Sequence, residues 1–170
     1  ASNEAELKEG HIEMIVSQAI TQMITISHNY AALLLADKIK NSEITGFLES
    51  EGFKNSSLGS ASDVPRSTAA DIALFYEKLY KGEIVDKDAS REMLEILKKQ
   101  KLNDGLPRLL SKDVAVAHKT GDIGWFKHDG GIVFTQKGDY IIVVMSESDS
   151  PTGAQERISK LSRAVYKYFN

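Results

Sequence analysis

The tripeptide Lys119-Thr120-Gly121 places an ammonium, a hydroxyl and a glycine next to an apolar segment. A lysine charge and a threonine hydroxyl can together bind a carboxylate. Glycine allows a ligand to approach a strand edge closely, and an exposed edge can pair with an extended ligand. This chemistry predicts a carboxylate-binding site at a strand that ends in a cleft. The alternative is a solvated lysine beside a turn, because so short a motif also arises by chance.

A second polar group, Ser27-His28-Asn29, comes just before a very apolar segment, Tyr30–Ile39. That segment is apolar over most of its circumference, which predicts a buried helix. Ser or Asn at this point can act as a helix N-cap. Alternatively, polar side chains at the mouth of a core helix can face a pocket. The sequence leaves both interpretations open.

The elements that must position these motifs follow the order helices, strands, helix, which indicates an α+β fold. Helical periodicity begins at His11 and continues to Ile24. Three short β-branched segments, 114–119, 130–135 and 140–146, predict antiparallel strands joined by tight turns. Further helices are expected at 44–50, at 67–82 with Ser67 or Thr68 as the cap, from Asp86 or Asp88 onward, and at 152–168. We expect one domain over 1–170, mainly helical in 11–112, with the strands and last helix in 113–170.

Composition excludes several classes of function. The chain has 170 residues, a net charge of −3 and no basic block, which argues against nucleic acid as its main partner. It contains no cysteine, so neither disulfides nor thiolate chemistry are expected. Its 4 histidines lack zinc-type spacing, and we expect no metal and no cofactor. No apolar run is long enough to cross a bilayer. The chain begins with Ala1, from which we expect that a preceding part was removed.

With both motifs in view, the chain resembles the penicillin-recognising serine hydrolases, closest to class A β-lactamases and low-molecular-weight penicillin-binding proteins. The family's Ser-x-Asn motif fits residues 27–29 and its Lys-Thr-Gly motif fits 119–121. Flanking segments match too: "YAALLLADKI", "HDGGIVFT" and "STAADIALFYEKLYKGEIV". The resemblance runs from about residue 10 to the C-terminus. It implies a β-lactamase-like helical part on an antiparallel sheet with a C-terminal helix, lacking the N-terminal part of the fold.

The resemblance implies a role for each motif residue. Ser27, Asn29 and Lys119 would be catalytic: Ser27 relays a proton to the leaving nitrogen, and Asn29 hydrogen-bonds the substrate amide. Thr120, Gly121 and Asp122 would bind substrate. Lys119 and Thr120 would hold its carboxylate, and the Asp122 backbone N–H would form part of an oxyanion hole.

Two departures from the family pattern affect catalysis. The family nucleophile lies in Ser-x-x-Lys, but no serine here is followed by lysine three positions later. A preceding helix and two strands of the family are missing as well. In addition, the loop expected to carry a deacylating glutamate, 52–67, contains none. An acyl-enzyme should therefore hydrolyse slowly, as in a penicillin-binding protein.

The resulting expectation is acyl transfer from a β-lactam or a D-Ala-D-Ala peptide, by a protein working outside the cytoplasm. A segment of the same protein ahead of this chain would supply the nucleophile. The alternatives are a non-catalytic module that binds cell-wall peptide or a protein partner, and an unrelated α+β domain with chance motifs. Near the site, His118 should face away from Lys119 in a structural role. His128 and Asp129 are expected to form a hydrogen-bonded pair, or else to anchor substrate.

Overall fold

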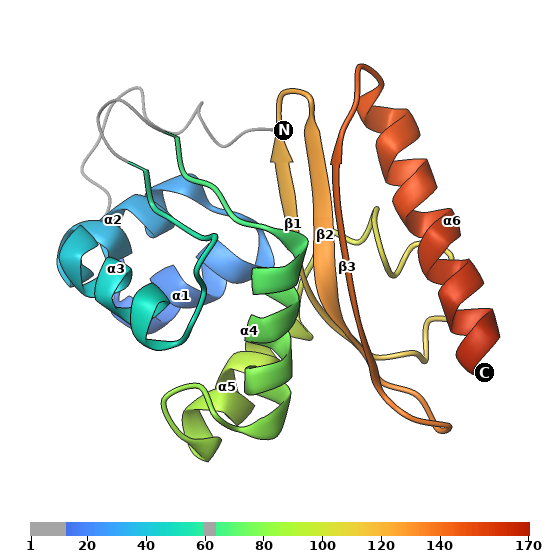
Figure 1. Ribbon diagram of the computed structural model, residues 1–170, viewed down its shortest axis with the longest axis horizontal. Coiled ribbons are helices and arrows are strands. Elements are labelled where there is room, and N and C mark those ends of the chain that lie inside the picture. Colours follow the sequence, from blue (N-terminus) through green and yellow to red (C-terminus); the bar gives the residue numbers. More distant parts are fainter. Residues whose placement is uncertain (1–12, 60–63) are drawn as a thin grey trace.

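The computed structural model describes residues 13–59 and 64–170. Figure 1 shows a central sheet with the N-terminal helices on one side and the last helix on the other. The helices are α1 (Val16–Thr25), α2 (Asn29–Ile39), α3 (Asn41–Ser50), α4 (Ala69–Lys81), α5 (Lys87–Leu97) and α6 (Pro151–Phe169). The strands are β1 (Val116–Ile123), β2 (Phe126–Val133) and β3 (Tyr140–Glu147).

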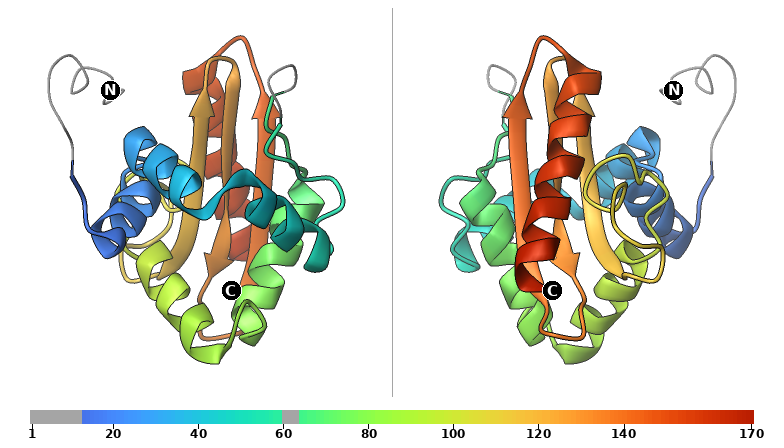
Figure 2. Two further views of the ribbon diagram at one scale, coloured as in Figure 1. Left: turned by 90° about the vertical axis from the view of Figure 1, so that its left-hand side faces the viewer. Right: turned by 90° about the vertical axis from the view of Figure 1, so that its right-hand side faces the viewer.

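The sheet is antiparallel with strand order β1-β2-β3, so both β1 and β3 are edge strands among the described residues. Figure 2 shows α6 lying along one face, while α4 and α5 cover the other. The expected α+β class and the antiparallel pairing are confirmed. The helical face of the sheet carries Lys119 and the opposite face carries His118, because neighbouring residues of a strand point to opposite faces.

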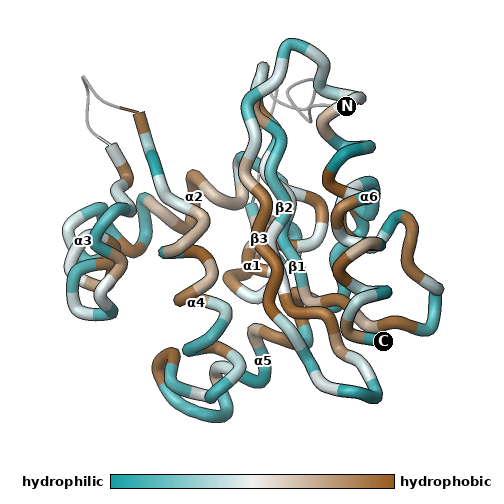
Figure 3. The backbone as a smooth tube through the Cα atoms, turned by 45° about the vertical axis from the view of Figure 1, so that its right-hand side comes forward, coloured by the Kyte–Doolittle hydropathy of each residue, from teal (hydrophilic) through white to brown (hydrophobic). Residues whose placement is uncertain are grey.

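Each face of the sheet has its own hydrophobic core. On the helical side, buried Phe53, Tyr76, Leu79 and Leu97 pack with Ala117 and Ile132 of the sheet. On the other side, Leu106, Val116, Val133 and Ile142 pack against Ile158 of α6. Figure 3 shows the corresponding hydrophobic stretch along β3. The sheet is therefore a rigid layer between two cores, and β1 is held from both sides.

Local signals set several helix ends as predicted. Thr68 caps α4 by accepting a hydrogen bond from the Asp71 N–H, and Asp86 caps α5 in the same way. Gly82 ends α4 in the left-handed conformation, with φ of 75°. Ser150 was expected to cap α6, but its side chain makes no capping hydrogen bond, and the helix begins at Pro151.

Several predictions about the bounds and burial of the elements are wrong. Residues 13–15 are not helical, so the first helix begins later than His11, which itself lies outside the described residues. In α2 only Ala31 and Leu35 are buried, whereas Leu33 is 63% exposed and Leu34 is 44% exposed. The first strand does not end at Lys119 but continues to Ile123, because the tight turn at Gly124-Trp125 extends the pairing through the motif.

Candidate active site

The Lys-Thr-Gly motif lies within edge strand β1, and hydrogen bonding decides which backbone groups face outward. Phe134 donates its N–H to the Ala115 carbonyl, and these residues are opposite each other in the extended register of β1 and β2. Hydrogen-bonded pairs alternate along an antiparallel ladder, so Lys119 and Gly121 point their backbone groups toward β2. The N–H and C=O groups of Thr120 and Asp122 therefore face the free edge of the sheet.

Ser27 approaches this edge from the connection between α1 and α2. Its φ is 53°, a left-handed value that is uncommon for a residue with a side chain. His28, and not Ser27 or Asn29, caps α2: its Nδ1 accepts a hydrogen bond of 3.2 Å from the Ala31 N–H. The sequence interpretation of Ser or Asn as the cap is thus wrong. Because His28 performs that task, the Ser27 hydroxyl is available to the site.

Lys119 joins the two motifs. Its Nζ donates a hydrogen bond to the Ser27 Oγ, 92 positions away in the chain. It donates a second, of 2.8 Å, to the Thr120 carbonyl. Burial lowers the pKa of Lys119 below its ordinary value of 10.5, and the negative charge of Asp129 opposes this shift. A lysine whose pKa is lowered in this way can exchange a proton more readily with a neighbouring hydroxyl.

A polar cleft of about 510 Å³ runs along the free edge of β1. Its lining includes five of the six residues singled out from sequence: Ser27, Asn29, Thr120, Gly121 and Asp122. The sixth, Lys119, reaches Ser27 from the helical face of the sheet. Lys127, whose side chain is 11% exposed, forms an ion pair with the Asp122 carboxylate at the cleft. The fold thus brings the two predicted motifs to one concave surface.

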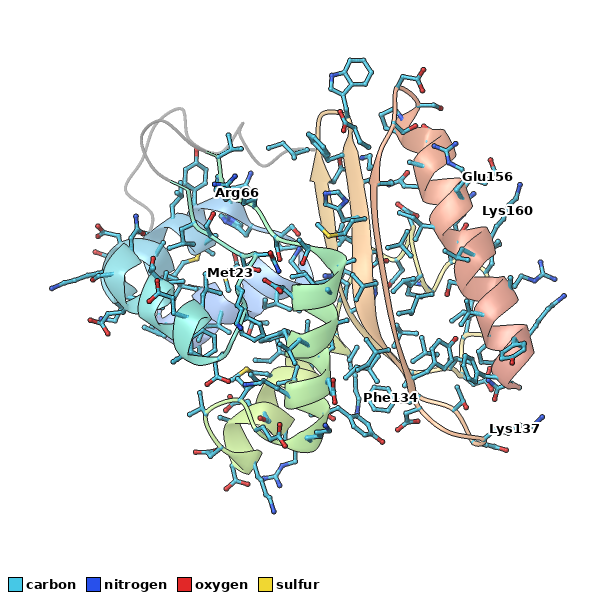
Figure 4. The ribbon with its side chains drawn as sticks, in the orientation of Figure 1. Met23, Arg66, Phe134, Lys137, Glu156 and Lys160 are labelled. Carbon is cyan, nitrogen blue, oxygen red and sulfur yellow. The ribbon has the colours of Figure 1, made fainter. Side chains whose placement is uncertain are left out.

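A second cavity, of about 460 Å³, lies between the helices and the sheet. Its walls come from α1, α4, α5 and the helical face of all three strands. Met23, labelled in Figure 4, lines it from α1, and Lys119 lies at its border. Nearly all of the lining is apolar, so this space is suited to an apolar group rather than to a polar substrate.

A buried polar pair that the sequence did not predict lies on the opposite face of the sheet. His118 and Asp129 are each 1% exposed, and the His118 Nδ1 lies 2.9 Å from the Asp129 Oδ1. The expected pair of His128 with Asp129 is therefore wrong; the Nδ1 of His128 instead accepts from the Ser146 N–H. The prediction that His118 faces away from Lys119 is confirmed. Alternation along β1 could have found the pair, since His118 and Thr120 share a face and Thr120 is opposite Asp129.

The carboxylate of Asp71, which the sequence did not single out as a contact of the loop, holds the loop before α4. Asp71, 6% exposed, accepts a 2.7 Å hydrogen bond from the Asn55 N–H and one of 2.9 Å from the Ser56 hydroxyl. Burial opposes ionisation of this group, but these hydrogen bonds outweigh it and lower the pKa of Asp71. Because its oxygens are occupied in this way, Asp71 holds the loop and is not directed at the cleft.

Within the part of the chain that the structure describes, no three His, Cys, Asp or Glu side chains are grouped to hold a metal ion. None of the described helices is long and apolar enough to span a membrane.

Comparison with known proteins agrees with this fold. A family model described as the β-lactamase enzyme family matches residues 6–169. The chain therefore belongs to the β-lactamase enzyme family. A search of curated proteins finds no significant match.

Solved structures of similar fold cover nearly the whole chain. A β-lactamase from Sphaerobacter thermophilus superposes with a TM-score of 0.89 at 21% identity, covering 96% of this chain and 66% of the other. The structure of PBP-A gives a TM-score of 0.89 at 26% identity, with 99% and 66% coverage. The TLA-3 extended-spectrum β-lactamase gives 0.84 at 22% identity, with 98% and 68% coverage. The chain thus spans about two thirds of the length of these proteins.

Proposed function

We propose that this chain is the larger part of a penicillin-binding type of serine acyltransferase, acting on a β-lactam or a D-Ala-D-Ala peptide outside the cytoplasm. The observation that carries the proposal is the contact between Lys119 and Ser27, which unites two motifs that are far apart in sequence. The family match and the fold support a hydrolase of this type. PBP-A offers a parallel, since one of its variants was solved as an acyl-enzyme complex with penicillin G.

In this proposal each motif residue has one task. The Ser27 hydroxyl relays a proton to the leaving nitrogen, with the Lys119 ammonium beside it to favour that transfer. Asn29 positions the substrate amide, and Thr120 and Lys119 bind its carboxylate. The outward-facing N–H of Asp122 is one donor of an oxyanion hole, which is consistent with its place at the free edge of β1.

The nucleophile would come from a segment ahead of this chain, carrying Ser-x-x-Lys. Two features support such a segment as part of the same folding unit. The apolar cavity beside Lys119 is large enough to take several apolar side chains. The outer edge of β3 has no strand partner among the described residues, although its sequence, "YIIVVMSE", is typical of a paired strand. We propose that residues 1–170 and this segment form one domain.

Slow deacylation follows from the same residues. No glutamate occurs in 52–67, and the one buried carboxylate that contacts the described part of this loop, Asp71, is occupied by hydrogen bonds. Without a placed general base, water should attack an acyl-enzyme slowly. We therefore expect an acylated form that persists, rather than rapid turnover of β-lactams.

Intact-mass spectrometry with benzylpenicillin tests the proposal. The 170-residue chain alone should gain no covalent adduct, and the longer protein with its preceding segment should gain one that persists. Lys119→Ala in the longer protein should slow acylation, while Lys54→Ala, at an exposed site, should not. An adduct on the chain alone would refute a nucleophile outside it. A longer protein that contains Ser-x-x-Lys but forms no adduct would refute the enzyme and favour a non-catalytic binding module.

A further inference from the structure

Ser27 and Lys119 belong to different layers of the fold, so something must set the distance between them. Ser27 follows α1, within the helical layer, whereas Lys119 belongs to the sheet. Their own contact is a single hydrogen bond between flexible side chains. A single bond from a charged donor contributes only about 1.5–3 kcal/mol net and does not fix the positions of two backbones.

The segment 100–106 bridges these two layers with polar contacts. At its start it binds the end of α1. The Gln100 Nε2 donates a hydrogen bond of 2.8 Å to the Ile24 carbonyl, and the Lys101 N–H donates one of 2.9 Å to the Thr25 carbonyl. The Gln100 side chain is only 5% exposed, so its amide bonds to protein groups rather than to solvent. Its Oε1 also accepts from the Lys101 and Leu102 N–H groups, at 3.0 Å each. The end of α1, immediately before Ser27, is thereby tied to this segment.

The other end of the segment binds the sheet directly behind the motif. The Asn103 Nδ2 donates to the Gln100 carbonyl, which orients the Asn103 Oδ1 toward the His118 Nε2, 3.0 Å away. The His118 Nδ1 binds the Asp129 Oδ1, and the other carboxylate oxygen accepts 2.8 Å from the Leu106 N–H. His118 is thus held at both ring nitrogens, and it is the residue next to Lys119.

Close packing leaves this bridge little freedom. A Cβ on Gly105 would clash with the Asp129 Oδ2, so the loop backbone passes directly against the carboxylate. On its far side the Leu106 carbonyl accepts 2.8 Å from the hydroxyl of Ser162, which is fully buried in α6. Buried, fully bonded polar networks of this kind favour one geometry, because any displacement leaves polar groups unpaired.

We propose that residues 100–106 act as a strap that sets the position of Ser27 relative to Lys119. His118 is the positioning residue through which the strap acts on β1, and Gln100 is its counterpart at α1. The proposal deepens the proposed function, because it concerns the pair on which catalysis would depend. It makes the buried side chain of His118 a part of the site, although that side chain does not line the cleft beside Ser27.

A distance measurement without ligand tests the strap independently of catalysis. The chain has no cysteine, so Leu33→Cys in α2 and Ile123→Cys in β1, at sites 63% and 75% exposed, can carry one nitroxide each. Double electron–electron resonance then reports the distance between the two layers. We expect a single narrow distribution in the parent chain. Gln100→Leu and Asn103→Leu, which cut the strap at opposite ends, should each displace and broaden it.

Two control variants separate positioning from simple loss of stability. Asn103→Asp keeps an acceptor oxygen for His118 but loses the donor to the Gln100 carbonyl, so it should broaden the distribution less than Asn103→Leu does. Ser90→Ala removes a buried hydroxyl that binds the Ile84 N–H and carbonyl, near the start of α5 and away from the end that leads into the strap. It should lower stability without changing the distance. The strap is refuted if both Leu variants keep the parent distribution, or if Ser90→Ala broadens it equally. Loss of acylation in the longer protein with an unchanged strap would instead refute only the proposed function.

Discussion

Replacing Lys119 by Met is expected to stabilise the chain while removing a residue on which the proposed function depends. The ammonium borders an apolar cavity, and burial lowers its pKa. The variant loses two hydrogen bonds donated by the ammonium, to Ser27 and to the Thr120 carbonyl, each worth about 1.5–3 kcal/mol because the donor is charged. The pKa of Lys119 is nevertheless lowered, so the desolvation of the charge outweighs the interactions that favour it. The variant also removes the desolvation cost of the charge, which amounts to several kcal/mol for a buried ion. We expect a net increase of roughly 1–2 kcal/mol in the free energy of unfolding at neutral pH.

The increase should shrink at alkaline pH, and its sign follows from proton linkage. In the folded chain Lys119 has a pKa below 10.5, its ordinary value in the unfolded chain. Below the folded pKa both states are protonated and the desolvation cost is complete. Between the two values the unfolded state binds more protons, so the stability of the parent chain rises with pH. Met has no such titration, and the advantage of Lys119→Met therefore decreases across this window.

Thermal unfolding followed by circular dichroism, in buffers from neutral to alkaline pH, measures both effects. For a chain of this size, 1–2 kcal/mol corresponds to an increase of about 2–8 °C in Tm. Lys54→Met, at an exposed lysine, is the matched control and should leave Tm nearly unchanged. A decrease in Tm for Lys119→Met, or an increase independent of pH, would show that desolvation of Lys119 does not dominate.

Three further outcomes are expected. Asp71→Asn should lower Tm by several degrees, and the parent chain should lose the same stability as the pH falls below 3.8, because the pKa of Asp71 is lowered by folding; an acid titration of Tm tests this. Gly105→Ala should lower the free energy of unfolding by about 1–3 kcal/mol, because the new methyl group meets Asp129. Gly46→Ala in α3, where no atom lies within 4 Å of the new methyl group, should raise it by about 0.5–1 kcal/mol. Unfolding in urea measures both changes. In the longer protein, affinity for a ligand carboxylate should decrease as the pH rises, and the decrease should already occur below pH 10.5, where Lys119 loses its proton. Lys119→Ala should abolish that dependence on pH.

Much of the fold could be predicted because it rests on local signals. The cap at Thr68, the stop at Gly82 and the start of α5 at Asp86 depend on backbone hydrogen bonds within a few residues. Boundaries that depend on pairing with another strand were less accurate. β1 continues to Ile123 because it pairs with β2 up to the turn. The start of β2 was predicted at residue 130, four residues later than the observed Phe126.

The site shows the same division. Family resemblance identified Ser27 and Lys119 separately, but no periodicity or spacing in the sequence implied that their side chains meet. His128 was paired with Asp129 because they are adjacent, yet adjacent strand residues point to opposite faces of the sheet. The true partner, His118, is opposite Gly131 and reaches Asp129 diagonally on the same face.

By itself, the sequence determined the order and type of the elements, the caps of α4 and α5, and the two motifs that identify the family. These depend on chemistry within a short stretch of chain. Only the tertiary structure decided that Ser27 lies against Lys119, that Leu33 is exposed on an apolar helix, and that residues 100–106 connect α1 to His118. Each of these depends on packing between segments far apart in sequence, where the relative placement of whole layers decides which side chains can touch.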